Sequence, residues 1–226
     1  MNAAGNGSRT SSRREGRRAE RREAILDVAE RAFLRNGYAH TTMSSIAVQL
    51  GGSKSTLWAY FSTKEELFTA ILLRTAHQLR TRLQAVIVVD ACFETNLRRF
   101  CHQYISLMCS PESIAAHRLI VAETTRFPNL GKMFFEHALG AARQVLIQMV
   151  AGAIHEQIVA PQDPSVAAEL LRSLCYGRCF QQLIFGLCDT VSDDEIVQDI
   201  NVAIATFLRA TAPAIRLERP FRDLRK

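Results

Sequence analysis

Residues 41–68 read TTMSSIAVQLGGSKSTLWAYFSTKEELF, which is two short helical patterns separated by a pair of glycines. The apolar positions of the first pattern fall on one helical face: Met43, Ile46, Ala47 and Leu50. Thr41 or Thr42 can cap this helix, because a threonine hydroxyl accepts hydrogen bonds from the free N–H groups of a first turn. Gly51-Gly52 is expected to end it, since the turn needs positive φ and glycine adopts that conformation without a Cβ clash.

The second pattern, KSTLWAYF at residues 54–61, predicts a helix of about two turns with Ser53 as its N-cap. Leu57 and Phe61 lie one helical turn apart and can anchor this helix on a core. Two short helices joined by a glycine-containing turn form a helix-turn-helix, whose second helix enters the DNA major groove. The stretch therefore predicts a DNA-binding unit.

The second helix carries polar and aromatic side chains that cannot all share the buried stripe with Leu57 and Phe61. Hydroxyls and the indole N–H can donate to phosphates, and a threonine methyl can contact thymine. Two further residues begin helices, where the helix dipole favours a phosphate oxygen. The residues expected to contact DNA here are Thr42, Lys54, Ser55, Thr56, Trp58, Tyr60 and Lys64. For Trp58 and Tyr60 the alternative is packing against neighbouring helices.

The excess of basic residues lies entirely in the first part of the chain. Residues 1–64 hold 11 Lys and Arg against 5 Asp and Glu, residues 65–226 hold 17 of each, and the net charge is +6. Such asymmetry is expected when one part of a chain meets a polyanion and the other does not. Residues 1–18 lack apolar periodicity and are expected to form a disordered basic arm. The arginines expected to neutralise phosphates or enter a minor groove are Arg13, Arg14, Arg17, Arg18, Arg21 and Arg22. A solvated tail is the alternative for residues 1–18.

Helical periodicity runs through the rest of the chain, and no alternating strand pattern occurs. The first helix starts at about residue 19, carries Ile25, Ala29 and Phe33 on one face, and is expected to stop at Asn36-Gly37. Further helices are predicted at about 64–88, 91–109, 111–126, 129–158, 163–188 and 193–210, with prolines and the acidic cap SDDE between them. The predicted fold class is all-α.

Residues 20–68 resemble the N-terminal DNA-binding segment of the TetR family of bacterial regulators. The resemblance rests on five features in one register: the paired Thr, the Ile-Ala, the Gly-x-Ser turn, the Leu-Trp-x-Tyr-Phe run, and the Lys-Glu-Glu-Leu that begins the next helix. Gly52 stands where the family usually carries Val, and Trp58 where it usually carries Tyr. The segment RLIVAETTRFPNLGKMFFEHAL at 118–139 resembles the AefR-like C-terminal domain. The resemblance implies a helix-turn-helix domain over 19–66, a helical ligand-binding and dimerisation domain over 67–212, and a tail over 213–226.

The same resemblance places an inducer pocket among the middle helices. The candidate ligand-binding residues there are Phe100, Tyr104, Met108, His117, Phe127, Phe134 and Phe135. Ordinary core packing is the alternative for each of them. Because residues 100–149 are rich in Phe, Met and Tyr and the domain lacks a visible cluster of arginines, the expected ligand is apolar or aromatic.

Family resemblance also implies a homodimer joined by a four-helix interface. The faces expected to meet the partner are Leu170, Leu174, Gly177 and Gln181 on one helix, and Ile196, Ile200, Ala203, Ile204 and Phe207 on the next.

Several functional classes lack a signal in the sequence. There is no Gly-rich phosphate loop, no G-x-S-x-G and no spaced metal-ligand cluster, so an enzyme, a cofactor and a metal site are not expected. The apolar runs are far shorter than the roughly 18–20 residues of a membrane-spanning helix, and no signal peptide is recognisable, so we expect a cytoplasmic protein without membrane attachment. Six cysteines fit small buried hydrophobes, with a thiol sensor at Cys175 and Cys179 as the alternative.

The predicted function is a ligand-responsive, dimeric transcriptional repressor that leaves a pseudo-palindromic double-stranded operator when a small molecule binds. The alternative is a DNA-binding architectural or assembly protein without an inducer. Ligand-dependent loss of operator binding separates the two.

Overall fold

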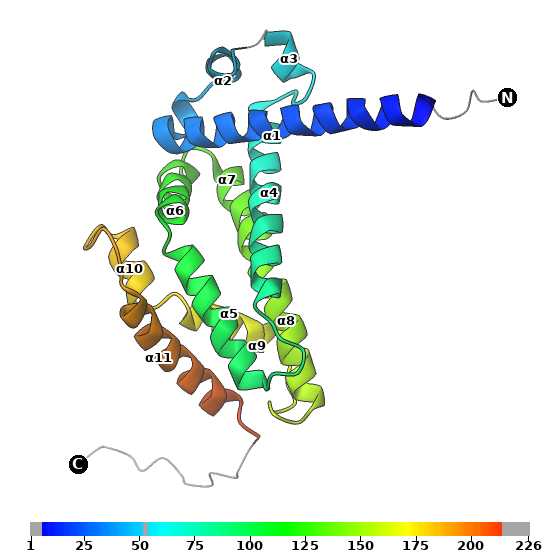
Figure 1. Ribbon diagram of the computed structural model, residues 1–226. Coiled ribbons are helices and arrows are strands. Elements are labelled where there is room, and N and C mark those ends of the chain that lie inside the picture. Colours follow the sequence, from blue (N-terminus) through cyan, green and yellow to red (C-terminus); the bar gives the residue numbers. More distant parts are fainter. Residues whose placement is uncertain (1–5, 52–53, 214–226) are drawn as a thin grey trace, which may run out of the picture. The chain divides into compact units, whose positions relative to one another are not determined.

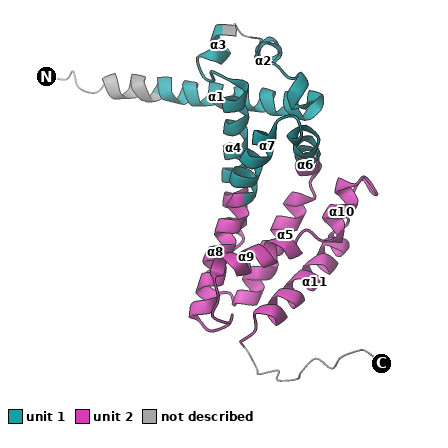
Figure 2. Cartoon of the chain, turned by 180° about the vertical axis from the view of Figure 1, so that it is seen from behind, with its two compact units in different colours: residues 1–78, 115–139 teal, residues 79–114, 140–226 magenta. Residues whose placement is uncertain are grey.

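The computed structural model describes residues 6–51 and 54–213, and every regular element in these residues is a helix (Figure 1). The all-α prediction is confirmed. The chain divides into two compact units, coloured in Figure 2: unit 1 is residues 1–78 with 115–139, and unit 2 is residues 79–114 with 140–226.

Unit 1 contains the helix-turn-helix. Its elements are α1 (Asn6–His40), α2 (Met43–Gln49), α3 (Lys54–Trp58), most of α4 (Lys64–Ala85), the later part of α6 (Pro111–Thr124), α7 (Pro128–Met133) and the π-helix η1 (Phe134–Leu139). Two glycines end helical segments as predicted: Gly37 interrupts α1 at φ 80 and ψ 161, and Gly51 follows α2 at φ 62. Glycine suits both positions because a Cβ would be strained at these φ values.

The N-terminal arm differs from its prediction over residues 6–18. These residues continue α1 as helix, whereas the sequence predicts disorder for 1–18; residues 1–5 lie outside the described residues. Residues 6–18 contain several arginines and Glu15, which are good helix formers, and extending an existing helix requires no new nucleus. Low hydrophobicity therefore does not exclude helix at this position, because α1 is already nucleated by its buried residues.

The core of unit 1 joins segments that are distant in sequence. Phe33, Tyr38 and Phe68 form an aromatic cluster with ring centroids 5.2–5.4 Å apart. Residues of α6, α7 and η1 are buried in the same core: Ile120, Leu130, Phe134 and Ala138. The compact unit is therefore larger than the DNA-binding domain predicted at 19–66, because sequence periodicity does not tell which core a helical face joins.

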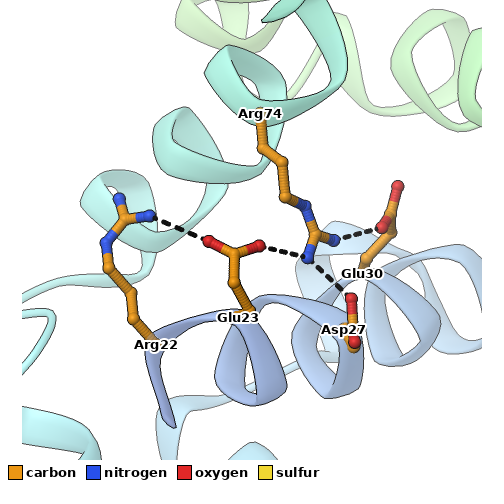
Figure 3. Close-up of polar contacts among 5 residues, drawn as sticks. All are labelled: Arg22, Glu23, Asp27, Glu30 and Arg74. Carbon is orange, nitrogen blue, oxygen red and sulfur yellow. Dashed lines mark hydrogen bonds and ion pairs between the residues drawn. The ribbon is translucent and has the colours of Figure 1, made fainter. Parts of the chain in front are cut away.

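Arg74 of α4 binds three carboxylates of α1 (Figure 3). Its guanidinium nitrogens lie 2.6 Å from Asp27 Oδ1, 2.6 Å from Glu30 Oε2 and 3.3 Å from Glu23 Oε2. Only 12% of the Arg74 side chain is exposed. Since three acceptors offset the cost of burying the guanidinium, this network fixes α4 against α1.

We expect Arg74→Met to lower the free energy of unfolding by about 1–2 kcal/mol, because the charge-assisted hydrogen bonds are lost while the half-exposed carboxylates regain water. Thermal and denaturant unfolding of the full chain measure the effect. Arg31→Met, at an exposed position of α1, is the matched control and should change stability by less than about 0.5 kcal/mol. Equal stabilities of the two variants would contradict a bracing role for Arg74.

Unit 2 is built from α5 (Phe93–Met108), α8 (Gly140–His155), α9 (Pro164–Leu174), α10 (Arg178–Ile184) and α11 (Asp193–Thr211). Helices α5, α8, α9 and α11 enclose a core that includes Leu97, Phe100, Leu146, Leu171 and Phe207, each less than 1% exposed. Two of these helices begin with N-cap residues. Asp163 caps α9 and accepts a hydrogen bond from Ser165 N, and Ser192 caps α11 and forms a capping box with Glu195.

Two predicted long helices are broken in the structure. The pattern at 129–158 contains α7, η1 and α8, where a π-helical turn shifts the register that a continuous α-helix would keep. The pattern at 163–188 is divided at Gly177, which precedes α10. A Cβ at Gly177 would lie 2.7 Å from Asp199 Oδ2, the oxygen that accepts the Cys179 N–H at 2.8 Å. Glycine therefore allows the Asp199 carboxylate to bind the first turn of α10.

The predicted partner-facing stripe of α11 is core instead. Its residues are all buried within unit 2: Ile196, Ile200, Ala203, Ile204 and Phe207. The exposed large apolar residues of the same helix are Val197 and Val202, at 39% and 66%. An amphipathic pattern marks the face of a helix that packs on its own core, so the predicted stripe of α11 is covered and is not available to a partner.

Candidate nucleic-acid interface

Helix α2 begins with a complete capping box. Thr42 Oγ1 accepts a hydrogen bond from Ser45 N at 3.1 Å, and Ser45 Oγ accepts one from Thr42 N at 3.1 Å. Thr41 has a different role, because its buried hydroxyl donates towards Gly37 O at 2.7 Å and Ala32 O at 3.1 Å. Thr42 is thus the cap, and its exposed side chain stands at the start of α2, where the sequence predicts a phosphate contact.

Helix α3 separates anchoring residues from outward-facing ones. Leu57 and Phe61 are 1% and 3% exposed, which confirms both as anchors. Trp58 is 41% exposed, so its indole is available at the surface and is not buried between helices. Ser55 is also exposed, whereas Thr56 and Tyr60 are half-buried. The Lys54 side chain and the predicted cap Ser53 lie outside the described residues.

Arginines of α1 extend the basic surface beside α3. Arg13, Arg14, Arg17 and Arg18 are exposed on the helical arm. The Arg18 guanidinium carbon lies 5.8 Å from the ring centroid of Tyr60.

The two arginines that follow, Arg21 and Arg22, are placed differently. Arg22 lies 5.4 Å from the ring centroid of Phe61 and 3.6 Å from Glu23 (Figure 3), while Arg21 is half-buried. These cation–π contacts join the arm to the end of the α3 segment.

Lys64 is engaged within unit 1. Its ammonium donates to Tyr38 O at 2.9 Å and lies 4.2 Å from the Tyr38 ring centroid. Burial lowers the pKa of Lys64. The N-terminus of α4 is capped as well, because Thr63 Oγ1 accepts from Glu66 N and Glu66 Oε2 accepts from Ser62 N. The predicted phosphate contact of Lys64 therefore competes with internal partners and stays a prediction.

The seven candidate ligand residues are divided between the units. Phe100, Tyr104 and Met108 lie in the core of unit 2, where the Phe100 and Tyr104 rings stack at 5.9 Å. The other four belong to unit 1: His117, Phe127, Phe134 and Phe135. Phe134 is buried and contacts the His117 ring edge-on at 4.9 Å, whereas Phe135 is 61% exposed.

Sequence reasoning missed a polar cluster in unit 2. Arg172 of α9 binds Glu169, and its guanidinium carbon lies 5.2 Å from the ring centroid of Tyr176. The hydrogen bond from Arg172 lowers the pKa of Glu169. The i, i+4 spacing of Arg172 and Tyr176 is a visible signal, but their approach to Tyr104 of α5 depends on tertiary packing.

The cysteines are arranged differently from the predicted sensor pair. Cys175 Sγ lies 3.9 Å from Cys101 Sγ, and both thiols are buried. The neighbouring Cys175 and burial raise the pKa of Cys101, and burial raises the pKa of Cys179 to about 12. Thiolates are the reactive form, so the thiols of Cys101 and Cys179 are poor nucleophiles.

Within residues 6–51 and 54–213 no group of three or more metal-ligating side chains gathers. In the same described part of the chain, no helix is long and apolar enough to cross a membrane.

Family models match two separate segments of the chain. Residues 25–71 match the bacterial regulatory proteins of the tetR family, and residues 95–213 match the AefR-like transcriptional repressor C-terminal domain. The chain belongs to the TetR family. Both predicted resemblances are thereby confirmed, and TetR-family proteins are DNA-binding transcription regulators.

Relatives and solved structures of the TetR family cover most of the chain. An uncharacterized HTH-type transcriptional regulator of Mycobacterium tuberculosis is 38% identical over 84% of this chain and 88% of its own length. The solved flavonoid-responsive regulator FrrA is 31% identical, with a TM-score of 0.71 over 84% of this chain and 98% of its own. A TetR-family regulator structure from Mesorhizobium loti is 26% identical, with a TM-score of 0.75 over 86% and 98% of the two chains.

Proposed function

We propose that this chain is a dimeric transcriptional repressor that reads operator DNA through the exposed face of α3. The observation that carries the proposal is the division within α3, where buried Leu57 and Phe61 leave Ser55 and Trp58 exposed on the segment that matches the family's DNA-binding model. In a helix-turn-helix this second helix lies in the major groove. Nothing in this function requires catalysis, so we propose a binding protein and not an enzyme.

Phosphate contacts are assigned to the basic and hydroxyl groups around α3. Thr42 and Trp58 can donate to phosphate oxygens, while Lys54 and Ser55 are assigned to base edges. The exposed arginines of α1 extend this positive surface along the arm, and Arg18 is held at Tyr60 by its cation–π contact. Phosphate contacts supply affinity and orientation, whereas base-edge contacts supply sequence preference.

A two-fold dimer is proposed to form through exposed apolar residues of α9, of α11 and of the segment that directly follows α10. These residues are Val166, Leu170, Phe185, Leu187, Val197 and Val202, each between 37% and 76% exposed. Exposed apolar groups gathered on adjacent elements favour association. A dimer would place two recognition helices for a pseudo-palindromic operator.

The proposed inducer is a small aromatic molecule. Two observations support this proposal. The AefR-like domain contains many aromatic residues, and FrrA, which is 31% identical to this chain, is a flavonoid-responsive regulator. Such a ligand acts only through different affinities for the DNA-competent and incompetent states. The chain passes between its two units within α4 and within α6, which provides continuous helices for the coupling.

The experiment measures release of a fluorescent operator, selected from a random DNA pool, by fluorescence anisotropy. We expect saturating 7-hydroxyflavone to lower operator affinity about a hundredfold, equivalent to a coupling free energy of about 2.7 kcal/mol. An operator that binds tightly and is unaffected by 7-hydroxyflavone and by a panel of other small aromatics would contradict the inducer proposal. That outcome would favour the architectural alternative.

A further inference from the structure

Two phenol hydroxyls in unit 2 are buried without hydrogen-bond partners among the described residues: those of Tyr104 and Tyr176. Tyr104 lies on α5 and is 1% exposed, and Tyr176 follows α9 and is half-buried. A buried hydroxyl without a partner is unfavourable, so natural proteins keep such groups mostly where something else binds them. Two in one core are therefore a sign of a missing polar partner.

The two phenols are close neighbours. Burial raises the pKa of Tyr104, and the Tyr176 phenol raises it further. Burial also raises the pKa of Tyr176. Both hydroxyls thus keep their protons, and each can donate one hydrogen bond to an acceptor that reaches them.

Cationic groups stand beside these donors. Arg172 has 11% of its side chain exposed, stacks on Tyr176 and donates to Glu169 Oε2 at 2.9 Å through Nε. Arg143 of α8 lies 4.0 Å from the same Glu169 oxygen. Two arginines against one carboxylate leave a local charge of +1, which favours an acceptor that carries negative charge.

Apolar rings complete the surroundings. Phe100 stacks on Tyr104 at 5.9 Å, and Phe180 meets the Tyr176 ring edge-on at 4.8 Å. An aromatic body suits these rings, while the phenols and the arginines suit an oxygen at its end.

We propose that the Tyr104–Tyr176–Arg172 cluster is the polar end of a ligand site, and that it selects aromatic molecules carrying a negatively charged or strongly accepting oxygen. The proposal rests on the ligand response proposed above and adds the chemical group that is recognised. It adds an anionic or accepting oxygen and an arginine partner to the expectation of an apolar or aromatic ligand.

The test uses three compounds with one aromatic body: flavone, 7-hydroxyflavone and flavone-7-carboxylate. Their binding to the full chain is measured by titration calorimetry without DNA, so the result does not depend on operator release. We expect the hydroxyl and carboxylate compounds to bind at least tenfold more tightly than flavone, since each added hydrogen bond to a buried donor strengthens binding. If flavone-7-carboxylate binds more tightly than 7-hydroxyflavone, the site recognises a carboxylate. If 7-hydroxyflavone binds more tightly, the site recognises a phenol or phenolate oxygen.

The double variant Tyr104→Phe/Tyr176→Phe should reduce that preference to less than threefold while flavone binds as before. Tyr38→Phe is the matched control, because the Tyr38 hydroxyl is also buried without a partner but lies in the core of unit 1. The control should keep the full preference.

Thermal unfolding distinguishes a binding role from a structural one. Without ligand, the double variant should have an unchanged or higher Tm, because it removes hydroxyls that lack partners. A clear loss of Tm, an undiminished preference in the double variant, or no binding by any of the three compounds would overturn the proposal. Tight, selective binding without operator release would support this ligand site and contradict only the proposed function.

Discussion

Trp58→Ala should weaken operator binding about a hundredfold while the protein stays folded. Trp58 is 41% exposed on α3, so its removal costs little packing. Its indole N–H is assigned to a phosphate, and loss of one such contact costs about 1.4 kcal/mol in each subunit. A dimer loses two contacts, which gives about 2.8 kcal/mol and the stated hundredfold change.

The measurement is anisotropy of a selected operator at fixed salt, with circular dichroism as the test of folding. Leu73→Ala is the matched control, because Leu73 is another large apolar residue of unit 1 with 51% exposure. It should bind operator within a factor of about three of wild type. Leu57→Ala provides the opposite case, since truncation of this buried anchor should cost about 2–5 kcal/mol of stability. If Trp58→Ala binds as tightly as wild type, the indole does not contact DNA.

The helix-turn-helix could be predicted from sequence because its determinants are local. Apolar spacing identified Leu57 and Phe61 as anchors, and Gly37 and Gly51 marked the ends of helical segments. The outward-facing position of Trp58 could also be predicted, because Trp58 lies off the helical stripe that Leu57 and Phe61 occupy. Short-range patterns of this kind need no knowledge of the rest of the fold.

Tertiary contacts decided the features that the sequence did not reveal. Lys64 looked free to bind phosphate, but Tyr38, which is 26 residues earlier, supplies a carbonyl and a ring for its ammonium. The amphipathic face of α11 looked like an interface, but the core of unit 2 covers it. Arg172 and Tyr104 are on different helices, and only tertiary packing brings their side chains close enough to interact.

The break at Gly177 has a similar cause. A glycine within a helical pattern is common enough to leave the helix intact, and Asp199 of α11 supplies the acceptor that separates α9 from α10. The π-helical turn at η1 has no short sequence signature either.

Raising the salt concentration from 50 to 200 mM should weaken operator binding about 10⁴-fold. The interface is assigned about four phosphate contacts in each subunit, so a dimer makes about eight, and each contact releases counterions from the DNA. The log-log slope of the association constant against salt is about −0.9 for each contact, or about −7 in total. A fourfold change in salt at that slope gives the stated loss.

The arm contributes to this slope if its exposed arginines lie on phosphates. Removal of residues 1–18 takes away five arginines, among them the exposed Arg13, Arg14, Arg17 and Arg18, so we expect a slope shallower by about one for each lost contact. An unchanged slope in the truncated chain would make the arm a passive extension of α1.

The central claim is that this protein binds DNA through the basic surface around α3, and a salt titration of full-length wild type on its selected operator tests it most directly. Anisotropy between 50 and 200 mM salt should give a slope near −7, with Trp58→Ala binding more weakly at every point. A wild-type slope near zero would contradict the claim.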